Sequence, residues 1–253
     1  MKDRIIFITE VVLVICIIAF VAVYFIQSGE YNRSQQEYDG LSDYVKEPAE
    51  TLDERLSREG IPAMEIDFEA LKAQNEDFVG WLYMPGLDIS YPVVQGEDDE
   101  FYLHHTFEGT ENSSGCIFLE SKSSAELDEY NSFLFGHNMK NGTMFGSLKR
   151  LINEEGLYES AGRFYLYTPD AFRKYTVYSY YITSPGSDIY YLNESEEEYA
   201  AWQEKALADD AGSCGVEVDT TRPTLTLSTC SGAGADKQRL VVHGILDAMI
   251  ERQ

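Results

Sequence analysis

Basic residues are scarce in this sequence. Its 253 residues contain 19 Lys and Arg against 44 Asp and Glu, which gives a formal net charge of -25. Such a charge repels phosphate backbones, so nucleic-acid binding is not expected. The acidity indicates a soluble surface and does not identify a substrate. Internal repeats and low-complexity tracts are also lacking.

Cysteine is scarce as well. None of the four cysteines forms a zinc-binding spacing such as C-x2-C, so a structural metal is not expected. Cys16 lies in an apolar segment, which leaves Cys116, Cys214 and Cys230, an odd number. At least one of these thiols stays free unless two chains cross-link. A bond between Cys116 and Cys214 remains open.

Only one long apolar run occurs, from Ile5 to Ile26, and as a helix it is long enough to cross a bilayer. Lys2 and Arg4 precede this run and acidic residues dominate just after it, which predicts a cytoplasmic N-terminus and an extracellular remainder. A cleaved signal peptide is the alternative, but the run is long for one and no small-x-small site follows closely. The sequence favours an uncleaved signal anchor and a single tether.

The chain after the anchor divides into two parts by composition. Residues 28 to about 62 are polar and charged, with helical stretches interrupted by Gly60 and Pro62. Short apolar strands follow further along the chain. We therefore predict a cytoplasmic tip and anchor over 1–27, a partly helical extracellular stalk over 28–65, and the main domain over 66–253.

Short apolar and aromatic strands separated by turn signals make up the main domain. The predicted strands are Val79–Met84, Ile89–Val94, Gly115–Leu119, Ser132–Phe135, Arg163–Tyr167, Lys174–Ile182, Thr224–Thr229 and Leu240–Ile245. This pattern indicates a mainly β fold, either a closed barrel or a sandwich. Two helices are also expected, over Asp67–Gln74 and over Ser195–Asp209, the second just before the strand that leads to Cys230.

The strand near the C-terminus leads directly into a cysteine. In Thr224–Cys230 apolar and polar residues alternate strictly, which puts Leu225 and Leu227 on one face and Cys230 on the polar face. A small, turn-like segment follows, and then a strand that begins with Arg239. A buried structural role is the commoner one for a lone cysteine. The polar face and the strand-end position favour a nucleophile.

A cysteine nucleophile needs help, because an unperturbed thiol is mostly protonated near neutral pH. His137 follows the apolar strand Phe133–Phe135, at a position from which an imidazole can project into a cleft and carry protons. Arg239 lies nine residues after Cys230, and a loop of this length can bring the two strand ends together. Its guanidinium fork suits a carbonyl or an oxyanion. A solvated histidine and a surface arginine are the alternatives.

The other histidines are weaker candidates. His104 and His105 lie where a strand is expected to run into a loop, and an ordinary surface role is expected for them. His243 shares the strand parity of Arg239, but four residues of strand carry it roughly 13 Å further along. We keep His243 as a reserve candidate for the site.

Taken together, these residues resemble the class B sortases, membrane-anchored cysteine transpeptidases of Gram-positive bacteria. The motifs are Thr226-Leu227-Ser228-Thr229-Cys230, Arg239 opening the next strand, and Phe135-Gly136-His137-Asn138-Met139-Lys140 with Thr143-Met144-Phe145 after it. Supporting matches are Val79-Gly80-Trp81-Leu82-Tyr83-Met84-Pro85-Gly86 and Tyr91-Pro92-Val93-Val94-Gln95-Gly96. The resemblance covers about residues 66–248, and the combination is highly specific although each piece alone is not. Cys116 departs from the family, which more usually has a small or apolar residue there.

The resemblance implies a closed eight-stranded β-barrel with N-terminal helices and one helix inserted before the cysteine strand. It also implies acyl transfer without a cofactor. Cys230 would attack the carbonyl after a threonine in a C-terminal sorting motif, and His137 would protonate the departing amine. Arg239 would hold the carbonyl and the oxyanion, and Ser228 would contact the substrate.

The implied partners are exported proteins that carry the sorting motif, together with an amine of a peptidoglycan precursor or a pilin. The enzyme would lie in the cell membrane as a single-pass protein with its catalytic domain outside. One alternative is a surface cysteine peptidase that passes the same acyl group to water. The other is a non-enzymatic surface binding module, which fails to explain a Cys, a His and an Arg each at a strand end.

Overall fold

The computed structural model describes residues 2–46, 54–212, 214–230 and 238–252. Clustering of backbone contacts divides the chain into two compact units, residues 1–40 and 41–253. The first unit is almost entirely one helix, and the second contains all the strands found among the described residues. The predicted boundaries after residues 27 and 65 remain predictions.

The first unit consists of the helix α1 (Lys2–Leu41), which continues to the first residue of the second unit. Large apolar side chains are exposed along it from Ile6 to Ile26. A helix that is apolar all round suits a membrane interior, because its side chains need no polar partner there. Among the described residues, α1 contains the one stretch long and apolar enough to cross a membrane.

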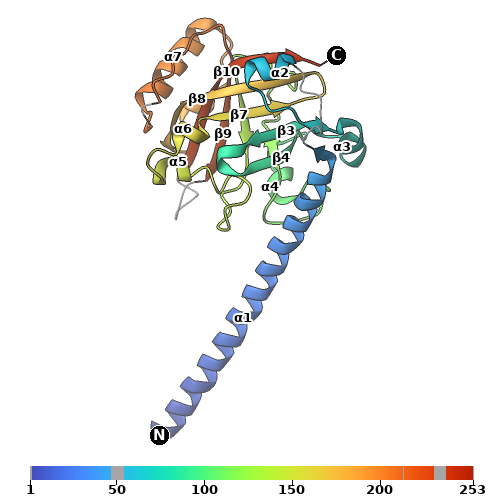
Figure 1. The fold of residues 1–253 in the computed structure, drawn as a ribbon. Helices are drawn as coiled ribbons and strands as arrows, with labels where there is room; N and C mark the ends of the chain where they lie inside the picture. The colour runs from blue at the N-terminus through green and yellow to red at the C-terminus, as the bar shows by residue number, and fades with distance from the viewer. Residues whose placement is uncertain (1, 47–53, 213, 231–237, 253) are drawn as a thin grey trace. The chain divides into compact units, whose positions relative to one another are not determined.

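The second unit is built on a closed eight-stranded barrel, as predicted (Figure 1). Around the barrel the strands follow the order β10-β8-β7-β3-β4-β5-β6-β9. Their bounds are β3 Phe78–Met84, β4 Ile89–Val94, β5 Ile117–Leu119, β6 Asn131–Phe135, β7 Arg163–Tyr167, β8 Ala171–Thr183, β9 Thr224–Cys230 and β10 Arg239–Glu251. The eight predicted strands are all present, and β8 and β10 are longer than expected.

Two pairs in this barrel are parallel, β4 with β5 and β6 with β9, and the other six are antiparallel. Parallel neighbours need a long crossover connection, because the chain must return to the same end of the sheet. Between β6 and β9 the crossover contains two strands, short helices and α7 (Glu196–Ala208). The ends of β6 and β9 therefore lie at the same edge of the barrel.

Shorter elements surround the barrel. They are η1 Ser42–Tyr44, β1 Val45–Lys46, α2 Glu54–Glu59, β2 Glu65–Ile66, α3 Phe68–Gln74, η2 Pro85–Leu87, α4 Phe101–His104, α5 Arg150–Asn153, α6 Tyr158–Ala161 and η3 Asp188–Tyr190. The helix predicted over Asp67–Gln74 is confirmed as α3, which begins after Asp67 because that carboxylate accepts a hydrogen bond from the Ala70 backbone N–H.

Residues 54–62 pack against the barrel. Leu56 and Ile61 are buried, and the Tyr167 hydroxyl donates a hydrogen bond of 2.8 Å to the Pro62 carbonyl. The Lys174 ammonium donates a bond of 2.9 Å to the Glu59 carbonyl. This segment, included in the predicted stalk, therefore lies on the barrel wall in the second unit.

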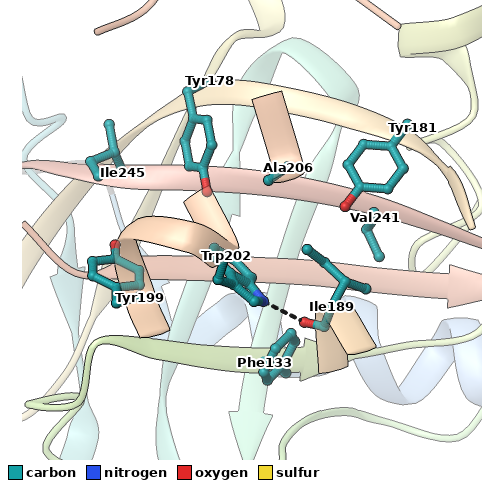
Figure 2. Close-up of a cluster of buried hydrophobic side chains, with 9 residues drawn as sticks. All are labelled: Phe133, Tyr178, Tyr181, Ile189, Tyr199, Trp202, Ala206, Val241 and Ile245. Atoms are coloured by element: carbon teal, nitrogen blue, oxygen red, sulfur yellow. Dashed lines mark hydrogen bonds between the residues drawn. The ribbon is translucent and has the colours of Figure 1, made fainter. Parts of the chain in front are cut away.

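A second layer, formed by η3 and α7 and called here the α7 layer, covers part of the outer barrel wall. Tyr199, Trp202 and Ala206 of α7 join a buried cluster with side chains of β6, β8, η3 and β10, as Figure 2 shows. The Trp202 indole N–H donates a hydrogen bond of 2.8 Å to the Ile189 carbonyl, which ties α7 to η3 (Figure 2). The helix predicted before the cysteine strand thus has a defined role, because it seals this wall.

Candidate active site

Three strand ends meet at one edge of the barrel. In the parallel pair of β6 and β9, Phe135 lies opposite Ser228, and the chain continues by two residues to His137 on one strand and to Cys230 on the other. In the antiparallel pair of β9 and β10, Arg239 lies directly opposite Cys230. The register therefore brings the three predicted residues to the same edge, with the cysteine strand in the middle. Only the backbone of Cys230 lies within the described part of the structure.

A pocket of about 240 Å³ opens at this edge. Its walls combine apolar, acidic and basic side chains from β5, β6, β9 and β10 and from residues 98–104, called here the α4 region. The lining residues are Asp99, Glu100, Leu103, Phe118, Phe135, Gly136, His137, Ser228, Thr229 and Arg239. Three of the four residues proposed for the site from sequence line this pocket directly, and the fourth, Cys230, follows Thr229 in the chain. The mixed lining can receive an extended peptide segment with both apolar and polar groups.

His137 is half-buried and held by one of its ring nitrogens. Its Nε2 lies 2.7 Å from the Leu103 carbonyl oxygen, and because a carbonyl only accepts, Nε2 carries the proton and donates. This bond fixes the tautomer of the neutral ring and leaves Nδ1 as the nitrogen that can exchange a proton. The backbone N–H of Phe145 donates to the His137 carbonyl at 3.0 Å, which folds the following loop back onto the strand end.

The α4 region holds His137 from the opposite side of the pocket. Just before α4, the Asp98 carboxylate accepts two backbone hydrogen bonds of 2.9 Å, from the N–H groups of Phe101 and Glu100, and these bonds lower the pKa of its carboxyl. Gly115 has a φ of +57°, and a Cβ there would lie 2.6 Å from the Tyr102 carbonyl oxygen, 2.9 Å from the Leu103 carbonyl oxygen and 3.1 Å from His137 Cδ2. Glycine at this position therefore lets the Leu103 carbonyl approach the ring.

Arg239 is half-buried at the first position of β10, as predicted. Its Nη1 donates a hydrogen bond of 3.0 Å to the Gln238 carbonyl. Arg239 also lines the pocket, as do the acidic residues Asp99 and Glu100. A fixed cation at this position can stabilise negative charge that develops on a substrate oxygen.

The polar face of β9 is not exposed, contrary to what its composition suggests. Thr224, Thr226 and Ser228 are all buried, because the α7 layer covers this face of the strand. Leu225 and Leu227 are also buried and point the other way, into the barrel. The alternation thus distinguishes two buried faces, and only the end of the strand reaches the pocket.

Ser228 lines the pocket, and its hydroxyl is already engaged. Its Oγ lies 2.9 Å from the Tyr190 hydroxyl of η3, and the residue is 1% exposed. A hydroxyl has one donor and two acceptor positions, so some hydrogen-bonding capacity remains for another group.

His243 lies outside the pocket. It is fully buried beneath α7, and desolvation lowers the pKa of its imidazole to about 3. It bonds to Thr226 and Tyr181 rather than to any pocket residue. The reserve assignment of His243 to the site therefore has no support in this geometry. His104 is exposed, and His105 stacks on Phe101 with ring centroids 4.0 Å apart.

The remaining cysteines have no place in the chemistry described. Neither Cys116 nor Cys214 forms a disulfide, so the possible bond between them is absent. Cys116 is fully buried, and burial raises the pKa of the Cys214 thiol to about 12, with the Asp210 carboxylate adding to the rise. Within the described ranges, no cluster of three or more His, Cys, Asp or Glu is arranged to hold a metal ion.

Four residues of the site region were not anticipated from sequence. Asp99 and Glu100 line the pocket, the Leu103 carbonyl holds His137, and Gly115 makes room for that contact. A backbone carbonyl leaves no sequence signal. Gly115 before an apolar strand was a usable signal, because an isolated glycine at such a place often marks a close backbone approach.

Comparison with known proteins agrees with the fold and the motifs. A family model described as the sortase domain matches residues 82–247. Sortase B of Listeria monocytogenes is 28% identical over 180 residues, covering 70% of this chain and 72% of that protein. A crystal structure of sortase B from Bacillus anthracis in complex with AAEK1 has a TM-score of 0.72 and 29% identity, covering 88% of this chain and 99% of that one. Sortase B of Clostridium perfringens has a TM-score of 0.65 and 29% identity, covering 70% and 98%.

The match to the family model extends over most of the barrel, from β3 to β10. It contains both strand ends of the pocket that carry His137 and Arg239, and it contains Cys230 between them. The chain belongs to the sortase family, and by its relatives and its barrel it is a class B sortase, a cysteine transpeptidase.

Proposed function

We propose that this sortase uses Cys230 as its nucleophile to cleave a sorting motif after its threonine, near the C-terminus of an exported protein. The Cys230 thiolate attacks the threonine carbonyl carbon, the C–N bond breaks, and a thioacyl-enzyme forms. An incoming amine then attacks the thioester and the thiolate leaves. The exported protein is thereby joined to that amine through a new amide bond.

One observation carries this proposal: the register of β6, β9 and β10 brings His137, Cys230 and Arg239 to one edge of the barrel. Each neighbour contributes a different chemical type, an imidazole on one side of the cysteine strand and a guanidinium on the other. Acyl transfer through a thiol needs both types, because a proton must move and an oxyanion must be stabilised.

His137 acts in this proposal as the proton carrier. With Nε2 bonded to the Leu103 carbonyl, Nδ1 gives a proton to the departing amine and later takes one from the incoming amine. The bond at Nε2 persists in both protonation states, because Nε2 donates in the neutral ring and in the imidazolium alike. The ring orientation therefore need not change between the two half-reactions.

Arg239 acts as the electrostatic partner. It holds the carbonyl that Cys230 attacks and stabilises the oxyanion of each tetrahedral intermediate. The position opposite Cys230 in the β9–β10 ladder supports this role. We assign Ser228 a substrate contact at the pocket wall, made with the hydrogen-bonding capacity that its bond to Tyr190 leaves.

The helix α1 and the charges around it support a proposed membrane arrangement. We infer a cytoplasmic N-terminus, because Lys2 and Arg4 precede the apolar segment, and a barrel on the outer side. There the enzyme meets exported proteins as they emerge. The acceptor in this proposal is an amino group of a peptidoglycan precursor or of a pilin subunit.

The test is mass spectrometry of the full-length chain in detergent micelles, incubated with a panel of Thr-containing sorting peptides, with and without triglycine. We expect a thioacyl adduct on Cys230 that resolves to an amine-linked product. The adduct should be absent in Cys230→Ala and the turnover strongly reduced in His137→Ala, whereas Cys214→Ala should behave as the wild type. Release of the free acid alone, even with the amine present, would instead indicate a peptidase, and an adduct on another thiol would refute the assignment of Cys230.

A further inference from the structure

His243 is a buried titratable group that the proposed reaction does not use. It lies on β10 directly opposite Thr226 of β9, four residues from Arg239, just as Thr226 lies four residues from Cys230. Both pairs fall on the same face of the two strands, because four residues are two full periods of the pleat. The buried pair and the pair at the pocket edge are thus two rungs of one ladder.

Both ring nitrogens of His243 are engaged. Thr226 Oγ1 lies 2.8 Å from Nδ1, and the Tyr181 hydroxyl of β8 lies 3.2 Å from Nε2. A neutral imidazole has one donor and one acceptor, so one hydroxyl donates to the ring and the other accepts from it. The single side chain therefore links three neighbouring strands.

The surroundings hold this ring in place. His243 is fully buried, and its ring centroid lies 5.1 Å from that of Trp202, 5.4 Å from that of Tyr181 and 5.9 Å from that of Tyr178. These are uncharged groups, and nothing at the ring favours an imidazolium. In a dry site a satisfied hydrogen bond resists displacement, because breaking it leaves a buried polar atom unpaired.

The bond to Thr226 differs from the other hydroxyl contacts of the β9 polar face. Thr224 and Ser228 bond outward, to Tyr199 of α7 and to Tyr190 of η3. Thr226 bonds sideways, to the strand that carries Arg239. Of these three hydroxyl contacts, Thr226–His243 alone joins the cysteine strand to the arginine strand through side chains.

We propose that His243 is a positioning residue, which through Thr226 holds β9 against β10 so that Cys230 and Arg239 stay aligned at the pocket. This inference rests on the proposed roles of those two residues. When the contact between Thr226 and His243 is lost, β9 can shift against β10, and the Cys230–Arg239 pair shifts with it. Small misplacements of reacting groups reduce the rate by large factors. The pocket residues Asp99, Glu100 and Leu103 lie outside these two strands, so the contacts that a substrate makes with them are kept and KM should change less than kcat.

The test exploits the different reach of two amides. In His243→Asn the side-chain amide replaces Nδ1 and keeps a partner for Thr226, whereas in His243→Gln it replaces Nε2 and keeps a partner for Tyr181. With full-length chains in micelles, we expect kcat of His243→Asn to stay within about threefold of wild type and kcat of His243→Gln to fall about tenfold. KM should stay within about twofold in both.

Two isosteric variants serve as matched controls. Thr226→Val should reproduce the loss of His243→Gln, and the double variant should lose no more than either single one, because both remove the same bond. Tyr181→Phe, which removes only the Nε2 partner, should leave kcat nearly unchanged. Equal losses in His243→Asn and His243→Gln, or wild-type kcat in both, would overturn the inference, since a ring that only fills space does not distinguish its two nitrogens.

A substrate-free measurement separates this inference from the proposed function. The rate of Cys230 alkylation is followed against pH by peptide mass spectrometry in the same chains. Because Arg239 lies opposite Cys230 in the β9–β10 ladder, its positive charge should favour the thiolate, so the midpoint should rise in His243→Gln and Thr226→Val but not in His243→Asn. Should the wild type turn over no peptide, the proposed function fails, and the alkylation profile alone decides on His243: identical midpoints in all chains would overturn it.

Discussion

The two histidines on the strands that flank β9 have opposite surroundings. His137 is half-buried at the mouth of a pocket, with one nitrogen fixed by a backbone carbonyl and the other available. His243 is sealed beneath α7, with both nitrogens bonded to hydroxyls. The same side chain is suited to proton transfer in one place and to holding structure in the other. His137 follows the end of β6 at the edge of the barrel, whereas His243 lies four residues into β10, beneath α7. This difference in position separates the two roles.

The largest loss of activity is expected for a substitution of the histidine at the pocket, His137. We expect His137→Ala to lower kcat/KM about 10³-fold, because it removes the proposed proton carrier. The melting temperature should stay close to that of the wild type, since the ring is only half-buried. Steady-state kinetics and thermal denaturation measure the two effects. Retained turnover would show that another group carries the proton.

On the covered wall the largest effect should fall on stability. Trp202→Ala removes a buried indole and its hydrogen bond to the Ile189 carbonyl, and we expect a loss of about 3 kcal/mol in the free energy of unfolding. Denaturant titration measures it. Trp202→Phe is the matched variant and should lose less, because it keeps most of the packing. A loss below about 1 kcal/mol for Trp202→Ala would contradict the packing described for the α7 layer.

Gly115→Ala should disturb the pocket indirectly, by changing the orientation of His137. The added Cβ would lie 2.6 Å from the Tyr102 carbonyl oxygen and 2.9 Å from the Leu103 carbonyl oxygen that holds His137. We expect this part of the chain to shift and kcat/KM to fall about 30-fold as the ring loses its orientation. Gly109→Ala is the control, because Gly109 also has a positive φ, of +76°, but open space around it. Equal activity in the two variants would mean that backbone strain, and not the approach to His137, determines the effect.

Low pH should lower the free energy of unfolding through His243, which lies beneath α7. Its folded-state pKa of about 3 lies below the ordinary value of 6.5, so below pH 6.5 the unfolded chain binds a proton that the folded chain excludes, and stability falls. The advantage of the wild type over His243→Gln in unfolding free energy should shrink by about 1.4 kcal/mol per pH unit below 6.5. A constant difference from pH 7 to 4 would contradict this.

Glu120 titrates in the opposite sense and must be separated from His243. Burial, and then the charge of Asp99, raise the pKa of its carboxyl to about 7. The folded chain therefore holds a proton that the unfolded chain releases, so this contribution is present at low pH and lost as pH rises through 7. Because Glu120 is the same in both chains, it cancels in the comparison with His243→Gln.

The smallest effect is expected at the outer edge of the α7 layer. Lys205 of α7 forms an ion pair with Asp188 of η3, and both side chains are well exposed. Exposed pairs contribute little, so Lys205→Ala should cost less than about 0.5 kcal/mol and leave kcat unchanged. A larger loss, measured by the same denaturant titration, would indicate that this pair, and not Trp202, secures η3.

Local patterns predicted the strands well, because each strand here carries its own alternation and turn signals. Ile89–Val94 and Arg163–Tyr167 match the observed strands β4 and β7 to the residue. The extensions of β8 and β10 were missed. These two strands pair with each other along most of their length, and a long antiparallel ladder can carry polar positions that break a local apolar pattern.

The candidate site was predictable only as a set of strand ends. Sequence placed His137, Cys230 and Arg239 at such ends, but the register that brings them together depends on which strands are neighbours in the closed barrel. The burial of Thr226 could not be foreseen, because its cover comes from α7, a helix that ends sixteen residues before β9 begins. The sequence of a helix does not by itself indicate which face of a sheet the helix will cover.

The strands β6 and β9 are neighbours in the barrel but far apart in the sequence, which has a consequence during synthesis of the chain. A ribosome makes His137 long before Cys230 and Arg239, which enter with the last two strands that close the barrel. A chain truncated before β9 therefore lacks the thiol, the guanidinium and the closure of the wall together. If Cys230 is the nucleophile as proposed, unfinished molecules cannot form a thioacyl bond with another exported protein, and activity begins only when the barrel is complete.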